Sequence, residues 1–176
     1  LLKLCPDFGP KRTYLTDIGV QNFLVEVGGE IVTRGKKENS NWVIAIENPD
    51  QQDGQTQVLL DLQNHALATS GDYRNYYEED GKRISHTIDP RNGKPITHNT
   101  ASVSVIATSA LEADGWATAL SVLSPSEAFS LAERLHLKVY MLHRESNGLF
   151  SVRSTSSFQK HLIQGQLLEI DTSEVQ

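Results

Sequence analysis

The order of hydrophobic periodicities along the chain restricts its fold more than any other feature of the sequence. From residue 22 to residue 107, apolar residues recur at every second position in short runs separated by Gly, Pro, Asn and Asp, which is typical of β-strands. Between residues 110 and 135 the period becomes that of helices, and strand patterns return at 138–143 and 148–153. Runs of strands with segregated helices predict an α+β protein with mixed or antiparallel sheets and flanking helices.

Turn-forming residues divide the strand region into short elements. A strand over 22–27 is interrupted at Gly28-Gly29, where glycine permits either a bulge or a turn. Residues 78–82 predict the turn of a hairpin, and residues 6–12 and 90–99 are predicted as loops. The strands that we expect in this region lie at 22–27, 31–33, 42–46, 57–62, 65–69, 73–77, 83–88 and 102–107.

Helix start and stop signals occur at several places. Ser109 precedes a helical pattern over 110–123 and is a candidate N-cap. Ser124-Pro125 opens a second helix that reaches about residue 135, because proline is favoured at the first helical position. We also expect a short helix over 156–163 and a helix over 13–18 that ends at Gly19.

Composition and charge exclude several classes of protein. The 176 residues are 38% hydrophobic and 22% charged, which excludes a wholly disordered chain. The net charge of −6 argues against a non-specific nucleic-acid binder, which would normally be basic, so we expect no nucleic-acid partner. No apolar run approaches the roughly 18 residues that a membrane-spanning helix needs. The single cysteine, Cys5, cannot form an internal disulfide, and Lys3 departs from the small residues that precede a lipid-bearing cysteine.

Two glycines in an apolar strand form the first candidate site, Gly28-Gly29-Glu30. One interpretation is a purely structural bulge. The other is backbone that closely approaches a ligand phosphate, which only glycine permits. The sequence alone leaves both interpretations open.

Polar residues at two predicted strand ends, in segments 70–77 and 85–90, form the second candidate site. His86 lies between two hydroxyl residues, with Asp89 three positions further on. A histidine with a pKa of about 6.5 can act as a base or donate to a phosphate near neutral pH. A lone histidine in a strand is also commonly structural. The tyrosine and hydroxyl content of these segments favours an adenine or isoalloxazine ring as the neighbour.

A carboxylate and a hydroxyl one helical turn apart form the third candidate site. Asp114 and Thr118 are spaced i and i+4 and therefore share one face of the predicted helix. Such oxygen ligands suit a hard cation such as Mg²⁺, and the small residues Ala113, Gly115 and Ala117 would allow a phosphate to come close. The alternative is a capped helix with an aspartate in its first turn, stabilised by the helix dipole.

Taken in this order, the three clusters resemble the ApbE family, the FAD:protein FMN transferases, over roughly residues 18–160. The specific stretches are His86-Thr87-Ile88-Asp89-Pro90 within 85–95, and the helix with Ala113-Asp114 and Thr118 within 112–120. The Gly28-Gly29-Glu30 segment and the stretches at 69–77 and 102–107 also agree with the family pattern. The resemblance implies a T-fold-related α+β fold. It also implies a Mg²⁺-dependent transfer of FMN from FAD onto a Thr hydroxyl of an acceptor protein, with release of AMP.

The resemblance implies a role for each site residue. Asp114 and Thr118 would hold Mg²⁺, with the Ala117 position at the same edge. His86 would be either the base for the acceptor hydroxyl or a donor to a phosphate oxygen. Ile88 would contact FAD, and Asp89 would hold the loop or hydrogen-bond the flavin. Gly71 would permit the chain to come close to the ligand.

The family pattern also has a portion upstream of the strand at 22–27, including an Ala-Lys-Gly-Tyr-like segment that helps bind FAD and gives Mg²⁺ another ligand. This sequence lacks that segment, and residues 8–12 resemble a family segment that lies much further upstream. We therefore expect either that residues are missing between about Pro10 and Thr13 or that the protein has a natural deletion there. The resulting division is a remnant of an N-terminal portion over 1–20, a transferase core over 21–165 and a polar tail over 166–176.

Partners and location follow from the resemblance alone. The acceptors would be flavin-bearing subunits of membrane redox pumps, such as Na⁺-translocating quinone reductases. The full-length protein would be a periplasmic lipoprotein tethered to the inner membrane. Two alternatives use the same residues: an FAD pyrophosphatase that gives FMN and AMP, and a non-catalytic FAD-binding protein.

Overall fold

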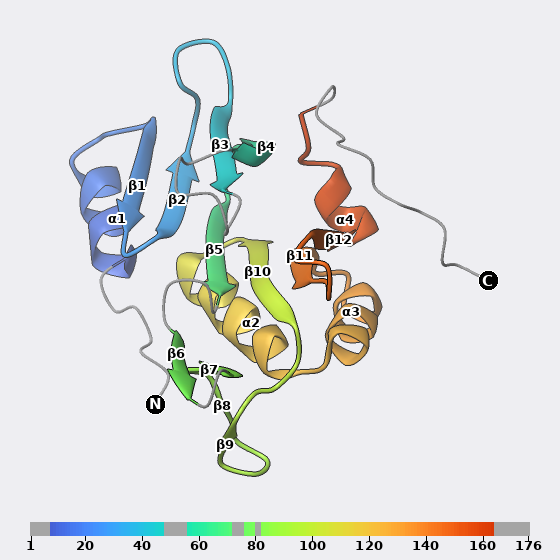
Figure 1. Cartoon of the computed structure of the whole chain (residues 1–176). Coiled ribbons are helices and arrows are strands. Elements are labelled where there is room, and N and C mark those ends of the chain that lie inside the picture. Colours follow the sequence, from blue (N-terminus) through green and yellow to red (C-terminus); the bar gives the residue numbers. More distant parts are fainter. Residues whose placement is uncertain (1–7, 48–55, 72–75, 80–81, 164–176) are drawn as a thin grey trace.

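A six-stranded antiparallel sheet is the centre of the fold (Figure 1). The computed structural model describes residues 8–47, 56–71, 76–79 and 82–163. Neighbouring strands in this sheet pair antiparallel. The expected α+β class with antiparallel sheets is thus confirmed. The strands in spatial order are β1 (Phe23–Val27), β2 (Glu30–Arg34), β5 (Ala66–Gly71), β10 (Thr100–Ala107), β11 (Lys138–Arg144) and β12 (Phe150–Ser154).

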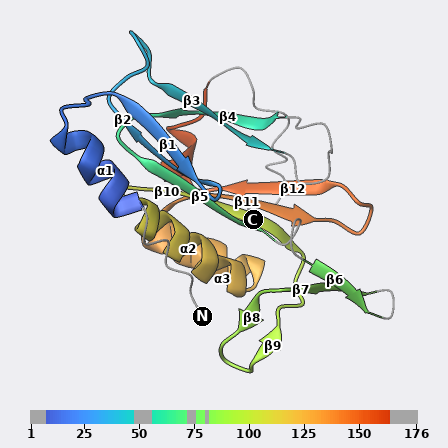
Figure 2. The same ribbon diagram turned by 90° about the vertical axis from the view of Figure 1, so that its left-hand side faces the viewer.

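Both faces of this sheet are covered, by different kinds of element (Figure 2). Helices α2 (Ala110–Val122) and α3 (Pro125–Arg134) pack on one face, where Val103, Val105 and Met141 are fully buried. The hairpin of β3 (Trp42–Glu47) and β4 (Thr56–Leu62) covers the other face together with α4 (Ser156–Gln159). Every residue of β10 is buried as a result.

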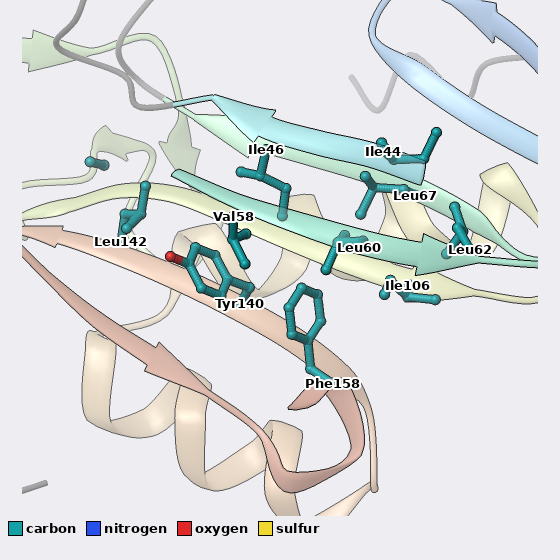
Figure 3. Packing of buried hydrophobic residues seen from close by; sticks show 11 residues of the cluster. Ile44, Ile46, Val58, Leu60, Leu62, Leu67, Ile106, Tyr140, Leu142 and Phe158 are labelled. Carbon is teal, nitrogen blue, oxygen red and sulfur yellow. The ribbon is translucent and has the colours of Figure 1, made fainter. Parts of the chain in front are cut away.

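The larger apolar core lies between the sheet and the β3–β4 hairpin (Figure 3). Leu60, Leu142 and Phe158 are fully buried there, and the rings of Tyr140 and Phe158 lie 5.4 Å apart. Residues after α4 extend this layer, because the amide of Asp61 donates to the carbonyl of His161. The core therefore ties the end of the described chain to the centre of the sheet.

Gly28 and Gly29 form the turn between β1 and β2. Their φ angles are +67° and +101°, a conformation that two-residue hairpin turns require and that side-chain-bearing residues rarely adopt. Of the two backbone forms that the sequence allowed, the structure has the turn rather than the bulge. The hairpin explains both glycines without a ligand.

The two main helices begin where their caps predict. The Ser109 side chain accepts a hydrogen bond from the amide of Glu112, and α2 follows. Ser124 and Glu127 form a reciprocal capping box with a proline in the first turn of α3. Both predicted helix starts are confirmed.

The N-terminal helix differs from the prediction. Helix α1 (Phe8–Asp17) occupies much of the stretch that we expected to be a loop, so that expectation is wrong from Phe8 onward. Pro10 lies in the first turn, where its missing N–H would have no partner in the helix anyway. The helix ends at Asp17, and Gly19 follows as the expected stop: its φ is +86° and its amide donates to the carbonyl of Thr16.

Smaller differences concern the hairpins that surround the candidate site. Strand β6 (Tyr76–Glu79) pairs with β7 (Lys82–Ser85), so the predicted hairpin is confirmed, but its second strand ends before His86. The predicted loop over 90–99 contains β9 (Lys94–Pro95), which pairs with β8 (Ile88–Asp89). Helix α4 is shorter than the expected 156–163.

Several sequence predictions fall outside the described residues. These are Cys5, part of the strand at 73–77 and the tail from residue 164 onward. In the part of the chain that the structure describes, no helix has the length and apolar character that crossing a membrane requires.

Candidate functional site

A small hollow opens where the ends of β5 and β10 meet α2 and the segment after β7. It has room for about one water molecule, roughly 10 Å³. Five of its lining residues carry a hydroxyl, and none of the described residues that line it is charged. The lining consists of Ser70, Gly71, Thr87, Ile96, Thr100, Ala101, Ser102 and Ser121.

Hydroxyl contacts connect this hollow to α2. The hydroxyl oxygens of Ser70 and Thr118 lie 3.1 Å apart, and the Ser121 hydroxyl donates to the Thr118 carbonyl at 2.8 Å. The structure thus brings Gly71 on β5 and Thr118 on α2 to the same place, although they lie far apart in the sequence.

Asp114 lies in the second turn of α2, one turn before Thr118. The acidic residue of the first turn is Glu112, whose carboxylate accepts from the hydroxyl of Thr108 at 2.8 Å. The alternative of a first-turn aspartate stabilised by the helix dipole is therefore wrong for Asp114. Partial burial raises the pKa of the Asp114 carboxyl, because the charged form loses hydration.

The chemistry of these groups fits Mg²⁺ when it arrives with a phosphate ligand. Among the described residues, no group of three or more His, Cys, Asp or Glu side chains surrounds a possible metal position. Mg²⁺ commonly needs only one or two carboxylates when substrate phosphates and waters complete its shell. Asp114 supplies one carboxylate and Thr118 a hydroxyl lone pair, while Ala117, a buried methyl side chain, can offer only its backbone oxygen.

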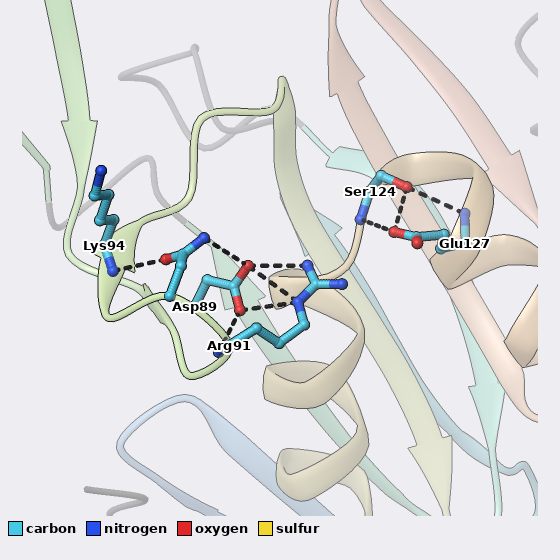
Figure 4. Close-up of polar contacts among 6 residues, drawn as sticks. Asp89, Arg91, Lys94, Ser124 and Glu127 are labelled. Carbon is cyan, nitrogen blue, oxygen red and sulfur yellow. Dashed lines mark hydrogen bonds and ion pairs between the residues drawn. The ribbon is translucent and has the colours of Figure 1, made fainter.

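The segment that follows His86 is a tight loop organised by Asp89 (Figure 4). Both carboxylate oxygens of Asp89 accept from the Arg91 guanidinium at 2.9 to 3.1 Å, and one accepts from the Arg91 amide. Asn92 donates to the same carboxylate at 3.3 Å. The hydrogen bonds from the side chain and the amide of Arg91 lower the pKa of Asp89. Of the two roles that the resemblance allows for Asp89, its contacts support holding the loop.

His86 and Ile88 lie on the outer side of this loop. His86 is exposed and follows the last residue of β7, while Ile88 is half exposed. Between them Thr87 lines the hollow, and its carbonyl accepts from the amide of Ile96 at 3.0 Å. His86 is therefore the neighbour in sequence of a residue that lines the hollow, and it is itself exposed.

Sequence reasoning gave no role to Thr100, Ser102 and Ser121, which line the hollow. One available signal was the placement of Thr100, Ser102 and Ser104 at alternate positions of an otherwise apolar, fully buried strand. A buried polar side chain needs a partner, so such a series marks either a polar network or a site. Ser104 belongs to a network, because its hydroxyl lies 2.7 Å from that of Thr69.

Comparison with known proteins identifies the family. The family model described as the ApbE family matches residues 11–141, well over half of the chain. The chain belongs to the ApbE family. It is 47% identical over 146 residues to the FAD:protein FMN transferase of Klebsiella pneumoniae (strain 342), and 44% identical over 146 residues to that of Escherichia coli (strain K12). Each alignment covers 82% of this chain and 41% of the relative.

Solved ApbE structures have the same fold. The apo form of the Pseudomonas stutzeri flavinyl transferase ApbE superposes with a TM-score of 0.76 at 43% identity, over 88% of this chain and 47% of that one. The ApbE protein of Thermotoga maritima also gives a TM-score of 0.76, at 25% identity, over 89% of this chain and 50% of that one. The chain spans about two fifths of the length of the curated ApbE relatives it matches.

We predict that Asp89→Asn loosens the loop at 89–93. The substitution removes the charge that Arg91 and Asn92 bind and weakens the acceptor for the Arg91 amide, so this amide should exchange with deuterium at least tenfold faster. Because the Asp89 pKa is lowered in the fold, the parent loop should keep its protection at neutral pH and lose it as the pH falls through that lowered pKa. Asp17→Asn, at an exposed carboxylate, is the matched control. Equal exchange in the parent and Asp89→Asn would contradict the loop-holding role.

Proposed function

We propose that this protein is a Mg²⁺-dependent transferase that moves FMN from FAD onto a Thr hydroxyl of an acceptor flavoprotein and releases AMP. One observation carries the proposal. A hydroxyl-lined hollow joins the loop that bears His86 to the face of α2 that bears Thr118. The names of the curated relatives, FAD:protein FMN transferase, support the same reaction.

The reaction forms one bond and breaks one bond at the same phosphorus. The acceptor hydroxyl oxygen attacks the FMN phosphorus of FAD, and the bond from this phosphorus to the bridging pyrophosphate oxygen breaks. AMP leaves with that oxygen, and the hydroxyl proton passes to a base. The protein has to position the two reactants and stabilise the charge that develops on the phosphoryl oxygens.

His86 is the residue that we propose for the proton. It is exposed beside the hollow, so an acceptor hydroxyl can reach it. General-base assistance of this kind is worth about 10² to 10⁴ in rate. Donation from His86 to a phosphate oxygen is the other contribution that its position allows.

Asp114 and Thr118 are the side chains that would hold Mg²⁺, with the backbone oxygen of Ala117 beside them. When bound, the ion supplies positive charge against the pyrophosphate oxygens. Thr118 can donate its proton to Ser70 and still offer a lone pair. Partial burial raises the pKa of the Asp114 carboxyl, and a cation held beside this carboxylate would favour its charged form.

We further propose a periplasmic, membrane-tethered location for the full-length protein and acceptors among the flavin-bearing subunits of membrane redox pumps. The family membership supports both proposals. Cell fractionation of the full-length product tests the location: recovery in the cytosol alone would contradict it.

The test of function is incubation of the chain with FAD, Mg²⁺ and a Thr-containing acceptor protein. We expect a mass gain of one FMN on the acceptor and equimolar AMP. AMP without labelling of the acceptor would indicate an FAD pyrophosphatase instead. FAD binding without AMP would indicate a binding protein.

We predict that His86→Ala lowers flavin transfer at least tenfold while the FAD dissociation constant and the melting temperature stay near those of the parent. His86→Asn should behave in the same way, because the proton-accepting ring is lost in both. His136→Asn is the control, since His136 is exposed and asparagine tolerates its φ of +54°. Joint loss of FAD binding and thermal stability would make His86 a structural residue. Unchanged transfer would place the base elsewhere.

We predict that Asp114→Ala abolishes Mg²⁺-dependent transfer without unfolding the protein. The raised pKa means that the carboxylate is desolvated, so its removal should leave the melting temperature unchanged or higher. In the parent, protons and Mg²⁺ compete for this carboxylate, so Mg²⁺ affinity should fall with decreasing pH, starting above the usual titration range of aspartate. Mg²⁺ titration calorimetry at several pH values measures the Mg²⁺ affinity of the parent and of Asp114→Ala, with Asp17→Ala as the control. Full Mg²⁺-dependent activity in Asp114→Ala would refute the metal assignment.

A further inference from the structure

His143 is a buried histidine to which the proposed chemistry gives no role. It lies on β11 directly opposite Thr100 of β10, and only 4% of its surface is exposed. Its Nδ1 lies 3.4 Å from the hydroxyl oxygen of Thr100, and among the described residues its Nε2 has no hydrogen-bond partner. Thr100 in turn lines the hollow. His143 therefore lies behind the wall of the hollow and touches it through one side chain.

The missing partner of Nε2 determines which nitrogen carries the proton. A neutral imidazole has one N–H donor and one bare nitrogen that only accepts. A buried donor without a partner is rarer than a buried acceptor without one. Burial is the main cause that lowers the pKa of His143 to about 4, so the ring is neutral over the physiological pH range. The proton accordingly belongs on Nδ1, where Thr100 accepts it.

This tautomer fixes the direction of the Thr100 hydroxyl. Because the Thr100 oxygen accepts from His143, its own proton is available for another acceptor. Among the described residues the structure shows no further hydrogen bond of this hydroxyl. The Ser121 hydroxyl, in contrast, already donates to the carbonyl of Thr118. Thr100 thus offers the hollow a hydrogen-bond donor that the protein itself does not use.

The size of the hollow restricts what can receive this hydrogen bond. A space for about one water molecule admits a single oxygen atom, whereas the rings of a nucleotide or flavin must stay outside. Its hydroxyl lining without charge suits an oxygen acceptor that is part of a larger ligand lying across the opening.

We propose that Thr100 donates a hydrogen bond to one oxygen of bound FAD and that His143 is the positioning residue that orients this hydroxyl; the inference rests on the proposed function. Thr100 then contributes to ground-state binding of FAD, and His143 contributes only through Thr100.

The experiment is a double-mutant cycle on FAD binding, followed by flavin fluorescence. Thr100→Val keeps the shape and removes the donor, and we expect roughly tenfold weaker binding at an unchanged melting temperature. His143→Leu should weaken binding by a similar factor in the parent and have no further effect in Thr100→Val. Thr97→Val, an exposed threonine in the same connection, is the matched control.

Conservative variants separate positioning from packing. Thr100→Ser keeps the hydroxyl, and His143→Asn keeps a donor near the place of Nδ1, so both should bind FAD within about threefold of the parent. A merely structural His143 would instead lower the melting temperature in both His143→Leu and His143→Asn and would act additively with Thr100→Val.

The outcomes distinguish this inference from the proposed function. If the parent binds FAD and Thr100→Val binds it equally well, the inference is wrong and the proposed function is unaffected. Additive effects of the two substitutions would overturn the role of His143 alone. If the parent binds no FAD, the proposed function and the inference fail together.

Discussion

The pairing of β5 with β10 is the interaction on which the candidate site depends. In this register Ser70 lies opposite Val103 and Gly71 opposite Ser102. Side chains alternate between the faces of a sheet, so Ser70 faces α2 and meets Thr118. A slip of one residue would turn Ser70 toward the β3–β4 layer and remove this contact. Leu67, buried in the core on the hairpin side, and Ala68, buried against α2, would exchange faces in such a slip and therefore oppose it.

Close packing of α2 against this sheet creates the electrostatic character of the site. Ala113 and Ala117 are fully buried, and such small side chains let the helix approach β5 and β10 closely. The same approach removes water from Asp114 and raises its pKa. A partly desolvated carboxylate and a hydroxyl-lined hollow are features that a binding site can use.

The small size of the hollow limits what the described residues can hold there. A hollow for about one water molecule can bind an atom of FAD, but it cannot enclose the molecule. The chain corresponds to about two fifths of the curated relatives. Under the proposed function, the described residues contribute the proton-transfer group, the metal-binding helix face and one oxygen subsite, and the rings of FAD lie outside this hollow.

Elements that are marked by local signals were predictable from the sequence. Ser109, Ser124-Pro125 and Gly19 mark helix ends, because capping and φ preferences act within a few residues. The three candidate sites at 28–30, 70–90 and 112–118 were recognisable because their residues lie close together in the sequence. The prediction of a loop was wrong from Phe8 onward, because Pro10 is compatible with a first helical turn. Proline and glycine in the sequence do not distinguish such a turn from a loop. At Gly28-Gly29 the sequence allowed both a turn and a bulge, and only the structure distinguished the two.

Which of these residues come into contact depends on how distant segments pack. Ser70 and Thr118 are 48 positions apart, and Thr100 and His143 are 43 apart. Their contacts depend on strand register and on how the helix packs on the sheet. A local sequence pattern predicts neither. Ser121 could not be recognised as a site residue, because a lone hydroxyl in a helix has many ordinary uses. The series that contains Thr100 indicates a polar network or a site without distinguishing the two. Chemistry that depends on spacing along one helix or loop was thus readable from the sequence, whereas the hollow exists only because distant segments pack together.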